Sequence, residues 1–546
     1  MVSMPAARSW RVWLGAALAS LALAAAAQPN KQGPERAERG DRSERVERFA
    51  DLSFTPETPS FAPGRKDFTS DAELAAFIAR LDALSNTMTW RILGKSPGGR
   101  DIHLMVFSSE GKSAPPELAA TRKPVVWLIG QQHGNEPAGA EAALEVARRL
   151  AVGDLRSVLD KLTVVVLPRA NPDGAAINRR ETSVADQNRD HLQLATLENQ
   201  LLHRAMRAMP PALVIDAHEF APAGRLLERF GVTQASDVLV QSASHPEISD
   251  SIRALSKESF DPALETAFKK AGLRSHLYHF LIDRPGQPND KPLITAGGNY
   301  AGIARNTFGL YGAVSYLIET RGIGLGREHW QRRVGAHVLA ASTLIRAAAT
   351  NVEALRRANA QARNGWTGDI TVDYESRREV RELPMIDAMT GEDRSLRADF
   401  INTLQVTPSI RRSIPVGYIL GPDQEAAAQR LAQHGLRVVR LFSATDANVE
   451  RFIMRTPRNE APEQGVPGDR VVVDTQTVTL NMPAGSFLVP MNQPLARVAS
   501  VALEPDAPGS FVATKLIRTN PASGTELPVY RLLLGLRAAG PLVEAP

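Results

Sequence analysis

The chain has 546 residues, of which 43% are hydrophobic and 23% charged, a composition typical of soluble globular proteins with more than one domain. The absence of cysteine excludes disulfides, thiolate metal sites and a cysteine nucleophile. The formal net charge is +5, or +3 without the two arginines of the first 27 residues, and so small an excess gives no argument for nucleic-acid binding.

Residues 1–27 have the pattern of a secretory signal peptide. Arg8 and Arg11 precede an apolar run, which ends in Ala25-Ala26-Ala27, an A-x-A cleavage site. We therefore expect export to a bacterial periplasm or to the extracellular space, with an uncleaved anchor as the alternative. No later run reaches the roughly 18 apolar residues of a membrane helix, so we expect no integral span after cleavage.

Residues 28–67 are predicted to form a charged, disordered tether. The stretch KQGPERAERGDRSERVER alternates Arg with Glu and has too few apolar residues to offset the entropy of ordering the chain. Order is expected to begin near Phe68. The stretch DAELAAFIARLDAL follows a Ser/Asp cap and has apolar residues at helical spacing, which predicts a helix.

Four apolar runs then predict buried strands, namely VVWLIG, VVVLP, ALVIDA and AVSYLIE. Helical patterns such as EAALEVARRL lie between them, and this alternation indicates an α/β fold. Each run ends at polar residues. In open α/β sheets the ligand crevice lies at the carboxyl ends of the strands. We therefore expect the polar residues at the ends of these four strands to lie together at one edge of the sheet.

Two of these strand ends carry potential metal ligands. His133 and Glu136 share one turn, with Pro137 placed to begin a helix. An H-x-x-E pair alone occurs by chance more often than not, but His218 ends another predicted strand. Two histidines and one glutamate form a zinc set that leaves a position open for catalysis, so we predict one Zn²⁺ per chain.

Two further elements complete a candidate site. Asn188 and Arg189 stand side by side in DQNRD, and arginine presents a planar fork suited to a carboxylate. Glu319 ends the fourth strand, where burial and a nearby cation would tune it as a general base. Each alone is more often a surface pair or a salt-bridge partner. Their occurrence together is what favours a functional site.

This ordered set of motifs, HGNE, NPDG, DQNRD, DAH and the strand-end Glu319, resembles the carboxypeptidase A-like zinc metallocarboxypeptidases, family M14. The resemblance covers roughly residues 68–360. It implies a mixed, mostly parallel sheet of about eight strands sandwiched by helices. It also implies release of the C-terminal residue from a peptide or peptide-like substrate that has a free C-terminal carboxylate.

The resemblance also implies roles for individual residues. His133, Glu136 and His218 match the zinc ligands, Asn188 and Arg189 the pair that holds the terminal carboxylate, Glu319 the general base, and Asp186 the acid that orients the first histidine. An arginine shortly before D-x-N-R stabilises the oxyanion in the family. Arg179 fits that place best, with Arg180 as its competitor.

Two substrate contacts are less sharply indicated. The capping tyrosine of the family is not obvious: Tyr300 and Tyr311 are candidates, and each is at least as often a packing residue. Arg305 lies in the segment expected to line the pocket for the departing side chain. It would favour an acidic side chain, unless it is salt-bridged within the protein.

The predicted domains are a catalytic domain at residues 68–363 and a smaller C-terminal accessory domain at 364–546, α/β or β-rich, with no metal or nucleophile constellation. The leading interpretation is an exported zinc carboxypeptidase. One alternative is an amidase of the same fold that cuts cell-wall peptides or N-acyl amino acids. An alternative of another class is an inactive peptide- or wall-binding protein.

Overall fold

The computed structural model describes residues 48–181, 185–282, 291–364, 366–455, 465–520, 522–536 and the short strand 543–544. The predicted signal peptide and the first part of the predicted tether, residues 28–47, lie outside the described residues. Among the helices that are described, none combines the length and the apolar character needed to cross a bilayer.

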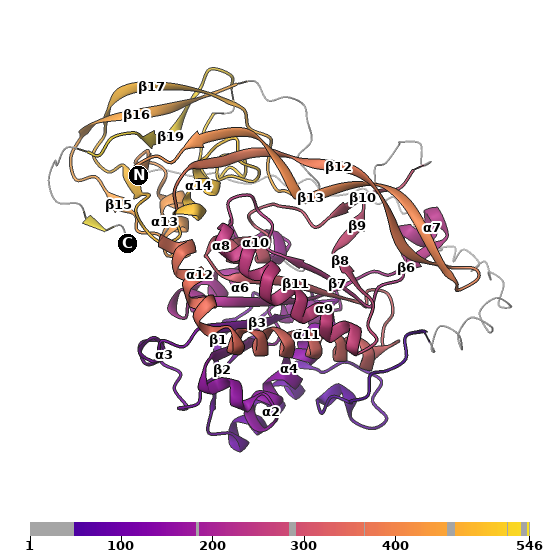
Figure 1. Ribbon diagram of the computed structural model, residues 1–546. Helices are drawn as coiled ribbons and strands as arrows, with labels where there is room; N and C mark the ends of the chain where they lie inside the picture. Colours follow the sequence, from indigo (N-terminus) through magenta and orange to yellow (C-terminus); the bar gives the residue numbers. More distant parts are fainter. Residues whose placement is uncertain are drawn as a thin grey trace, which may run out of the picture.

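An eight-stranded mixed sheet forms the centre of the catalytic region, in the order β1-β2-β4-β3-β5-β11-β7-β8 (Figure 1). Its strands are β1 (Met88–Lys95), β2 (Asp101–Phe107), β3 (Val125–Gly130), β4 (Thr163–Leu167), β5 (Pro211–Phe220), β7 (Val238–Ser242), β8 (Ser275–Leu277) and β11 (Val314–Arg321). The pairs β3/β4, β3/β5, β5/β11 and β7/β8 are parallel, and the pairs β1/β2, β2/β4 and β11/β7 are antiparallel. The predicted α/β fold is thus confirmed.

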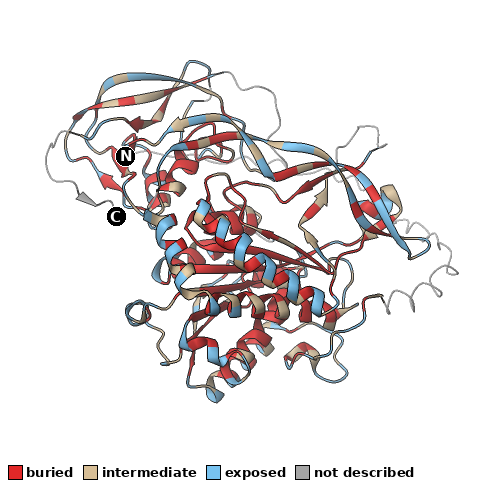
Figure 2. Cartoon of the chain, viewed as in Figure 1, coloured by how far each residue is buried: buried red, intermediate tan, exposed pale blue. Residues whose placement is uncertain are grey.

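Helices cover this sheet, and the apolar strands between them are buried (Figure 2). The helices are α2 (Asp71–Leu84), α3 (Pro115–Thr121), α4 (Pro137–Val152), α5 (Pro172–Ala176), α6 (Leu197–Ala208), α7 (Arg225–Phe230), α8 (Asp250–Leu255), α9 (Asp261–Lys270), α10 (Ala304–Leu310), α11 (Trp330–Thr350) and α12 (Val352–Asn364). The predicted helix α2 begins with a capping box, in which Ser70 and Glu73 satisfy each other's backbone N–H groups.

Part of the expected tether is ordered. Phe49 is buried and stacks near the guanidinium of Arg321, and Trp330 donates a hydrogen bond from its indole to Ser60, 2.9 Å away. The charge pattern that predicts disorder ends near residue 48. The next stretch carries the buried Phe49 and the partly buried Phe54 and Phe61, whose packing against the protein offsets the entropy of ordering it.

The C-terminal region begins with a long hairpin of β12 (Asp369–Asp387) and β13 (Asp393–Ser413), which crosses the catalytic region in Figure 1. The hairpin joins a five-stranded sheet in the order β6-β12-β13-β10-β9. The other three strands are β6 (Val232–Gln234), β9 (His279–Leu281) and β10 (Leu293–Ala296), and they come from the catalytic part of the chain. Strands from both sides of residue 364 therefore share one sheet and one small apolar core.

The rest of the C-terminal region is β-rich, as expected. Its seven-stranded sheet contains β14 (Gly417–Leu420), β15 (Val439–Arg440), β16 (Thr445–Met454), β17 (Val473–Met482), β18 (Phe487–Pro490), β19 (Glu526–Leu532) and β20 (Val543–Glu544). Helices α13 (Glu425–His434) and α14 (Ala496–Leu503) accompany this sheet.

Candidate active site

Three side chains converge at the carboxyl edge of the central sheet. His133 lies in the turn between β3 and α4, Glu136 caps α4, and His218 lies on β5. The Nδ1 atoms of the two histidines are 3.0 Å apart, and each lies 2.8 Å from one oxygen of Glu136. All three residues are buried, and among the described residues they form the one group of histidines and carboxylates compact enough to hold a metal ion.

The surroundings of the two imidazoles fit zinc. With Nδ1 turned to the shared centre, Nε2 of His133 lies 3.1 Å from Asp186, and Nε2 of His218 lies 2.9 Å from Asp216. A carboxylate behind each ligating histidine fixes its tautomer and raises its basicity. Burial alone would raise the pKa of Asp186, but the contact with His133 and the charge of Arg180 hold that pKa well below its ordinary value.

Asp216 has no assigned role in the sequence interpretation, although it is part of the quoted motif DAH. It stands two positions before His218 on β5, and residues two apart on a strand project from the same face. This two-residue periodicity was the feature of the sequence that could have indicated that Asp216 lies beside His218.

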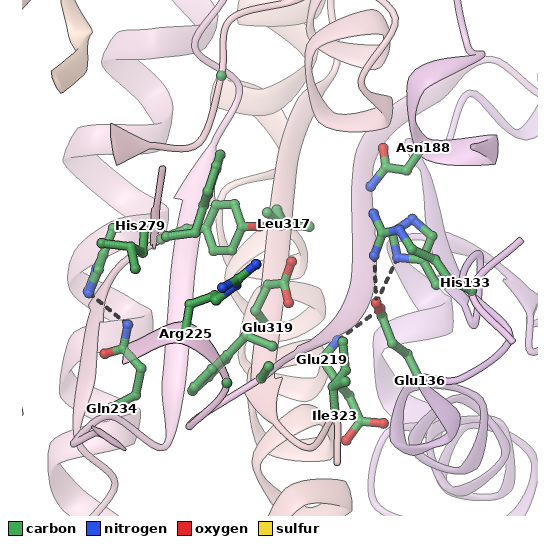
Figure 3. Close-up of a pocket in the computed structure, with 18 of the residues that line it drawn as sticks. His133, Glu136, Asn188, Glu219, Arg225, Gln234, His279, Leu317, Glu319 and Ile323 are labelled. Carbon is green, nitrogen blue, oxygen red and sulfur yellow. Dashed lines mark hydrogen bonds and ion pairs between the residues drawn. The ribbon is translucent and has the colours of Figure 1, made fainter. Parts of the chain in front are cut away.

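Glu319 lies beside the metal ligands because β11 pairs with β5 in parallel, with Glu319 directly opposite His218. Its side chain lines the pocket and is labelled in Figure 3. Burial, together with the negative charge of Glu136, raises the pKa of Glu319 from 4.5 to about 8. A carboxylate so poorly solvated is a strong proton acceptor.

The structure places the two candidate arginines differently. Arg180 lines the pocket, where its guanidinium lies 3.2 Å from Glu136 and 3.0 Å from Asp186. Arg179 is exposed and is not among the residues that line the pocket. The position favours Arg180 over Arg179 for a charge-stabilising role, contrary to the order of preference drawn from spacing.

Asn188 and Arg189 both line the pocket. The amide oxygen of Asn188 accepts a hydrogen bond from the backbone N–H of Ala304 at 2.8 Å, and its Nδ2 lies 3.0 Å from His218. Arg189 donates to the carbonyl of Asn188 at 2.8 Å. The C-terminal region reaches this guanidinium, because a Cβ built on Gly465 would lie only 3.1 Å from Nε of Arg189.

Arg305 lies in the pocket wall and is only 2% exposed. It donates to the carbonyl of Gly298 at 2.6 Å, and its Nε has no hydrogen-bond partner among the described residues. Burial lowers the pKa of Arg305 to about 10. Its hydrogen bond within the described ranges goes to a backbone carbonyl, and no carboxylate there is in ion-pair contact with it. The alternative of an internal salt bridge is therefore not supported.

The predicted capping tyrosines do not line the pocket. Tyr300 is buried against Gly302 and Gly509, and Tyr311 packs between α6 and α13. Tyr278 lines the pocket instead, where burial and the charge of Glu319 raise its pKa above the ordinary value. Tyr278 lies between the end of β8 and the start of β9. No sequence motif includes it, so the sequence alone did not indicate that it lines the pocket.

The pocket encloses about 250 Å³ and has two characters. Its polar part is lined by His133 and Glu136 of the metal-ligating group, by Glu319, and by Arg180, Arg189 and Arg305. The rest of its lining combines the apolar residues Phe220, Leu226, Phe280, Leu281 and Ile323 with the polar residues Arg225, Gln234 and His279. Figure 3 labels Arg225, Gln234, His279 and Ile323. Such a pocket suits a peptide end whose carboxylate and carbonyl face the polar wall.

The chain is similar to known proteins. The family profile Zinc carboxypeptidase matches residues 74–198. Carboxypeptidase 2 of Trichophyton rubrum is 30% identical over 480 residues, which cover 86% of this chain and 88% of that protein. Carboxypeptidase 2 of Trichophyton equinum is 29% identical over the same shares of the two chains.

A solved metallo-carboxypeptidase from Pseudomonas aeruginosa, in complex with (2-guanidinoethylmercapto)succinic acid, aligns at 21% identity with a TM-score of 0.37. The alignment covers 52% of this chain and 69% of that chain.

Proposed function

The chain belongs to the zinc carboxypeptidase family M14, and from that premise we propose that it removes the C-terminal residue of peptides with Glu319 as general base. The observation that supports this proposal is the convergence of His133, Glu136 and His218 beside Glu319 at one pocket.

The roles of the residues follow from their positions. His133, Glu136 and His218 would hold a zinc ion, which would supply a Lewis acid for the scissile carbonyl. Glu319 accepts the proton of the attacking water and returns it to the leaving amine, a task that suits its raised pKa. Arg180 faces the same space and stabilises the negative charge that develops on the carbonyl oxygen.

Selection of the chain end falls to Asn188 and Arg189. The guanidinium of Arg189 lines the pocket and offers a bidentate site for the terminal carboxylate. Asn188 is anchored through its amide oxygen to the backbone of Ala304, so that its position is fixed before substrate arrives. Tyr278 lines the pocket and Tyr300 does not, which supports Tyr278 as the tyrosine that covers a bound substrate.

The test compares the wild type with Glu319→Gln in the full chain. Both proteins are expected to bind one zinc ion, and the variant is expected to lose at least 1,000-fold in kcat because it has no base, roughly 4 kcal/mol in barrier height. A peptide with an amidated C-terminus is the matched control, since it offers no carboxylate to Arg189. Equal hydrolysis of free and amidated peptides would contradict an exopeptidase, and zinc binding without turnover of any substrate would favour a binding protein.

Arg305 supports a preference for an acidic C-terminal side chain. It is a buried cation without a carboxylate partner in the described structure, and such a group gains most from an anionic ligand. A charged hydrogen bond of about 1.5–3 kcal/mol predicts a roughly 10- to 100-fold higher kcat/KM for peptides ending in Glu than for those ending in Gln.

Arg305→Met, which keeps the length of the side chain, is expected to abolish that ratio while leaving peptides with apolar ends as substrates. The substrate panel includes cell-wall stem peptides and N-acyl glutamate, so that the amidase alternative is tested with the same two proteins. A wild type that treats Glu and Gln ends alike would contradict the role of Arg305.

Export is proposed on the pattern of residues 1–27 alone. A mature protein recovered from the periplasmic or culture fraction is expected to begin at Gln28. Recovery from the cytoplasm with an intact N-terminus would contradict export.

A further inference from the structure

A chain of buried polar side chains runs from the metal site into the C-terminal region. It begins at His218, whose Nε2 donates to Asp216 at 2.9 Å. The other oxygen of Asp216 contacts the side-chain amide of Gln132 at 2.6 Å, and the far end of that amide lies 2.7 Å from Nε2 of His191. Gln132 directly precedes His133, so both histidine ligands have a direct link to this chain.

The chain continues through three aromatic side chains. Nδ1 of His191 lies 2.9 Å from Nε2 of His203 on α6, and Nδ1 of His203 lies 2.8 Å from the hydroxyl of Tyr311 at the end of α10. That hydroxyl lies 2.6 Å from Nδ1 of His434, the last residue of α13. Nε2 of His434 then donates to the backbone carbonyl of Leu192 at 2.9 Å, which closes the path back to the catalytic region.

The direction of these bonds is set at the two ends of the path by the carbonyl of Leu192 and the amide oxygen of Gln132, which can only accept. Burial lowers the pKa of His434 and of His191 to about 4, so both rings are neutral near pH 7. Nδ1 of His434 therefore accepts from the hydroxyl of Tyr311.

At the other end Nε2 of His191 donates to the amide oxygen of Gln132, so Nδ1 of His191 accepts from Nε2 of His203. With all three rings neutral, the 2.8 Å contact between Nδ1 of His203 and the oxygen of Tyr311 joins two acceptors, and the orientation of both rings there depends on their other partners. The tautomer of each ring thus depends on the next group along the path.

A polar path of this kind is costly if it is broken. The side chains of His191, His203, Tyr311 and His434 are all buried, so a lost partner is not replaced by bulk water. Edge-to-face contacts of His203 with Tyr311 and of His203 with His434 hold the rings at interplanar angles of 86° and 90°.

We propose that Tyr311 and His434 are positioning residues for the metal site. Through His203, His191 and Gln132 they hold Asp216, and with it the imidazole of His218, in the orientation that binds the ion. The C-terminal region supports the catalytic centre through His434. This inference rests on the proposed function, but it concerns the affinity for zinc as well as turnover.

The test uses four full-length variants, namely Tyr311→Phe, His434→Leu, His434→Gln and Tyr316→Phe. Zinc affinity of the metal-free proteins is measured by competition with a chelator, and kcat and KM are measured on the same preparations well below their melting temperatures. Tyr316→Phe is the matched control, because Tyr316 is also buried and donates to Asp261 at 2.5 Å, away from the path.

Tyr311→Phe and His434→Leu are expected to weaken zinc affinity about threefold to tenfold and to lower kcat by a similar factor with KM unchanged. This is less than the roughly 10- to 100-fold loss typical for a direct partner of a ligating histidine. His434→Gln, which keeps a donor and an acceptor, is expected to recover most of the loss.

Equal zinc affinity in Tyr311→Phe and Tyr316→Phe would overturn the inference, whatever their melting temperatures. A wild type that binds zinc tightly but turns over no peptide would contradict the proposed function, and the ratio of zinc affinities would still decide the role of the path.

Discussion

Glu319, the proposed general base, is expected to lower the free energy of unfolding of the metal-free protein. Its pKa is raised from 4.5 to about 8, first by burial and then by the charge of Glu136. The folded state therefore binds this proton more tightly than the unfolded chain does. The free energy of unfolding falls as the pH rises through the window between the two pKa values, because folding must then return to the carboxyl a proton that the unfolded chain has lost.

The magnitude follows from the size of this window. The ionisation of Glu319 in the unfolded chain lowers the free energy of unfolding by about 1 kcal/mol at pH 5 and by about 3 kcal/mol at pH 7, with little further loss above pH 8. Gln has the shape of the neutral acid and does not ionise. Glu319→Gln is thus expected to be the more stable protein at pH 7, by about 3 kcal/mol, and to lose that advantage toward pH 4.5.

The assay is urea unfolding of the wild type and Glu319→Gln, each freed of metal by a chelator, at pH values from 5 to 9. Glu73→Gln serves as the control, since hydrogen bonds with Arg65 and Ser70 lower the pKa of Glu73 to about 2, so that its ionisation stabilises the folded state. The control is expected to be less stable than the wild type. A stability difference for Glu319→Gln that is absent, or that shrinks as the pH rises, would refute the reasoning.

Three further predictions concern the metal and the carboxylate clamp, by which we mean Asn188 and Arg189. Removal of zinc with a chelator is expected to abolish turnover and to lower the melting temperature, because an ion at 100 times its Kd stabilises the fold by about 2.7 kcal/mol; added zinc should restore both. Asp186→Ala is expected to weaken zinc affinity about 10- to 100-fold, as measured by chelator competition. Gly465→Ala is expected to raise KM about threefold or more with little change in kcat, because its Cβ would crowd Arg189.

Controls keep these outcomes interpretable. Gly485 has a similar positive φ of 89°, and a Cβ there would approach Arg440, which does not line the pocket. Gly485→Ala therefore carries the backbone strain of a side chain in the left-handed region without touching the site. Equal KM values for the two alanine variants would contradict contact with the clamp. Turnover that survives complete removal of metal would contradict the zinc mechanism.

The sequence predicted the fold class and the residues at the strand ends because both depend on local pattern. Continuous apolar runs indicate buried strands, and their carboxyl ends share one edge of the sheet. His133, Glu136, His218 and Glu319 each stand at or near such an end, and the structure brings all four to one place.

Other features depend on packing that spacing does not encode. Neighbouring positions in a turn project in different directions, so the choice between Arg179 and Arg180 required the backbone of that turn. Tyr300 is buried under Gly509, more than 200 positions later in the chain, and Tyr278 occupies the pocket wall. The path from His218 to His434 likewise joins residues that are adjacent only after folding.

The hairpin of β12 and β13 has a consequence for how this chain can be divided. Main-chain hydrogen bonds tie β13 to β10 and β12 to β6, and the strand next to β10 carries residues of the pocket wall. A gene fragment that stops at residue 364 would leave β10 and β6 with open edges and an apolar core uncovered, which invites aggregation. Recombination at that apparent boundary would therefore yield an insoluble product, so we expect the two regions to be inherited and engineered as a single unit.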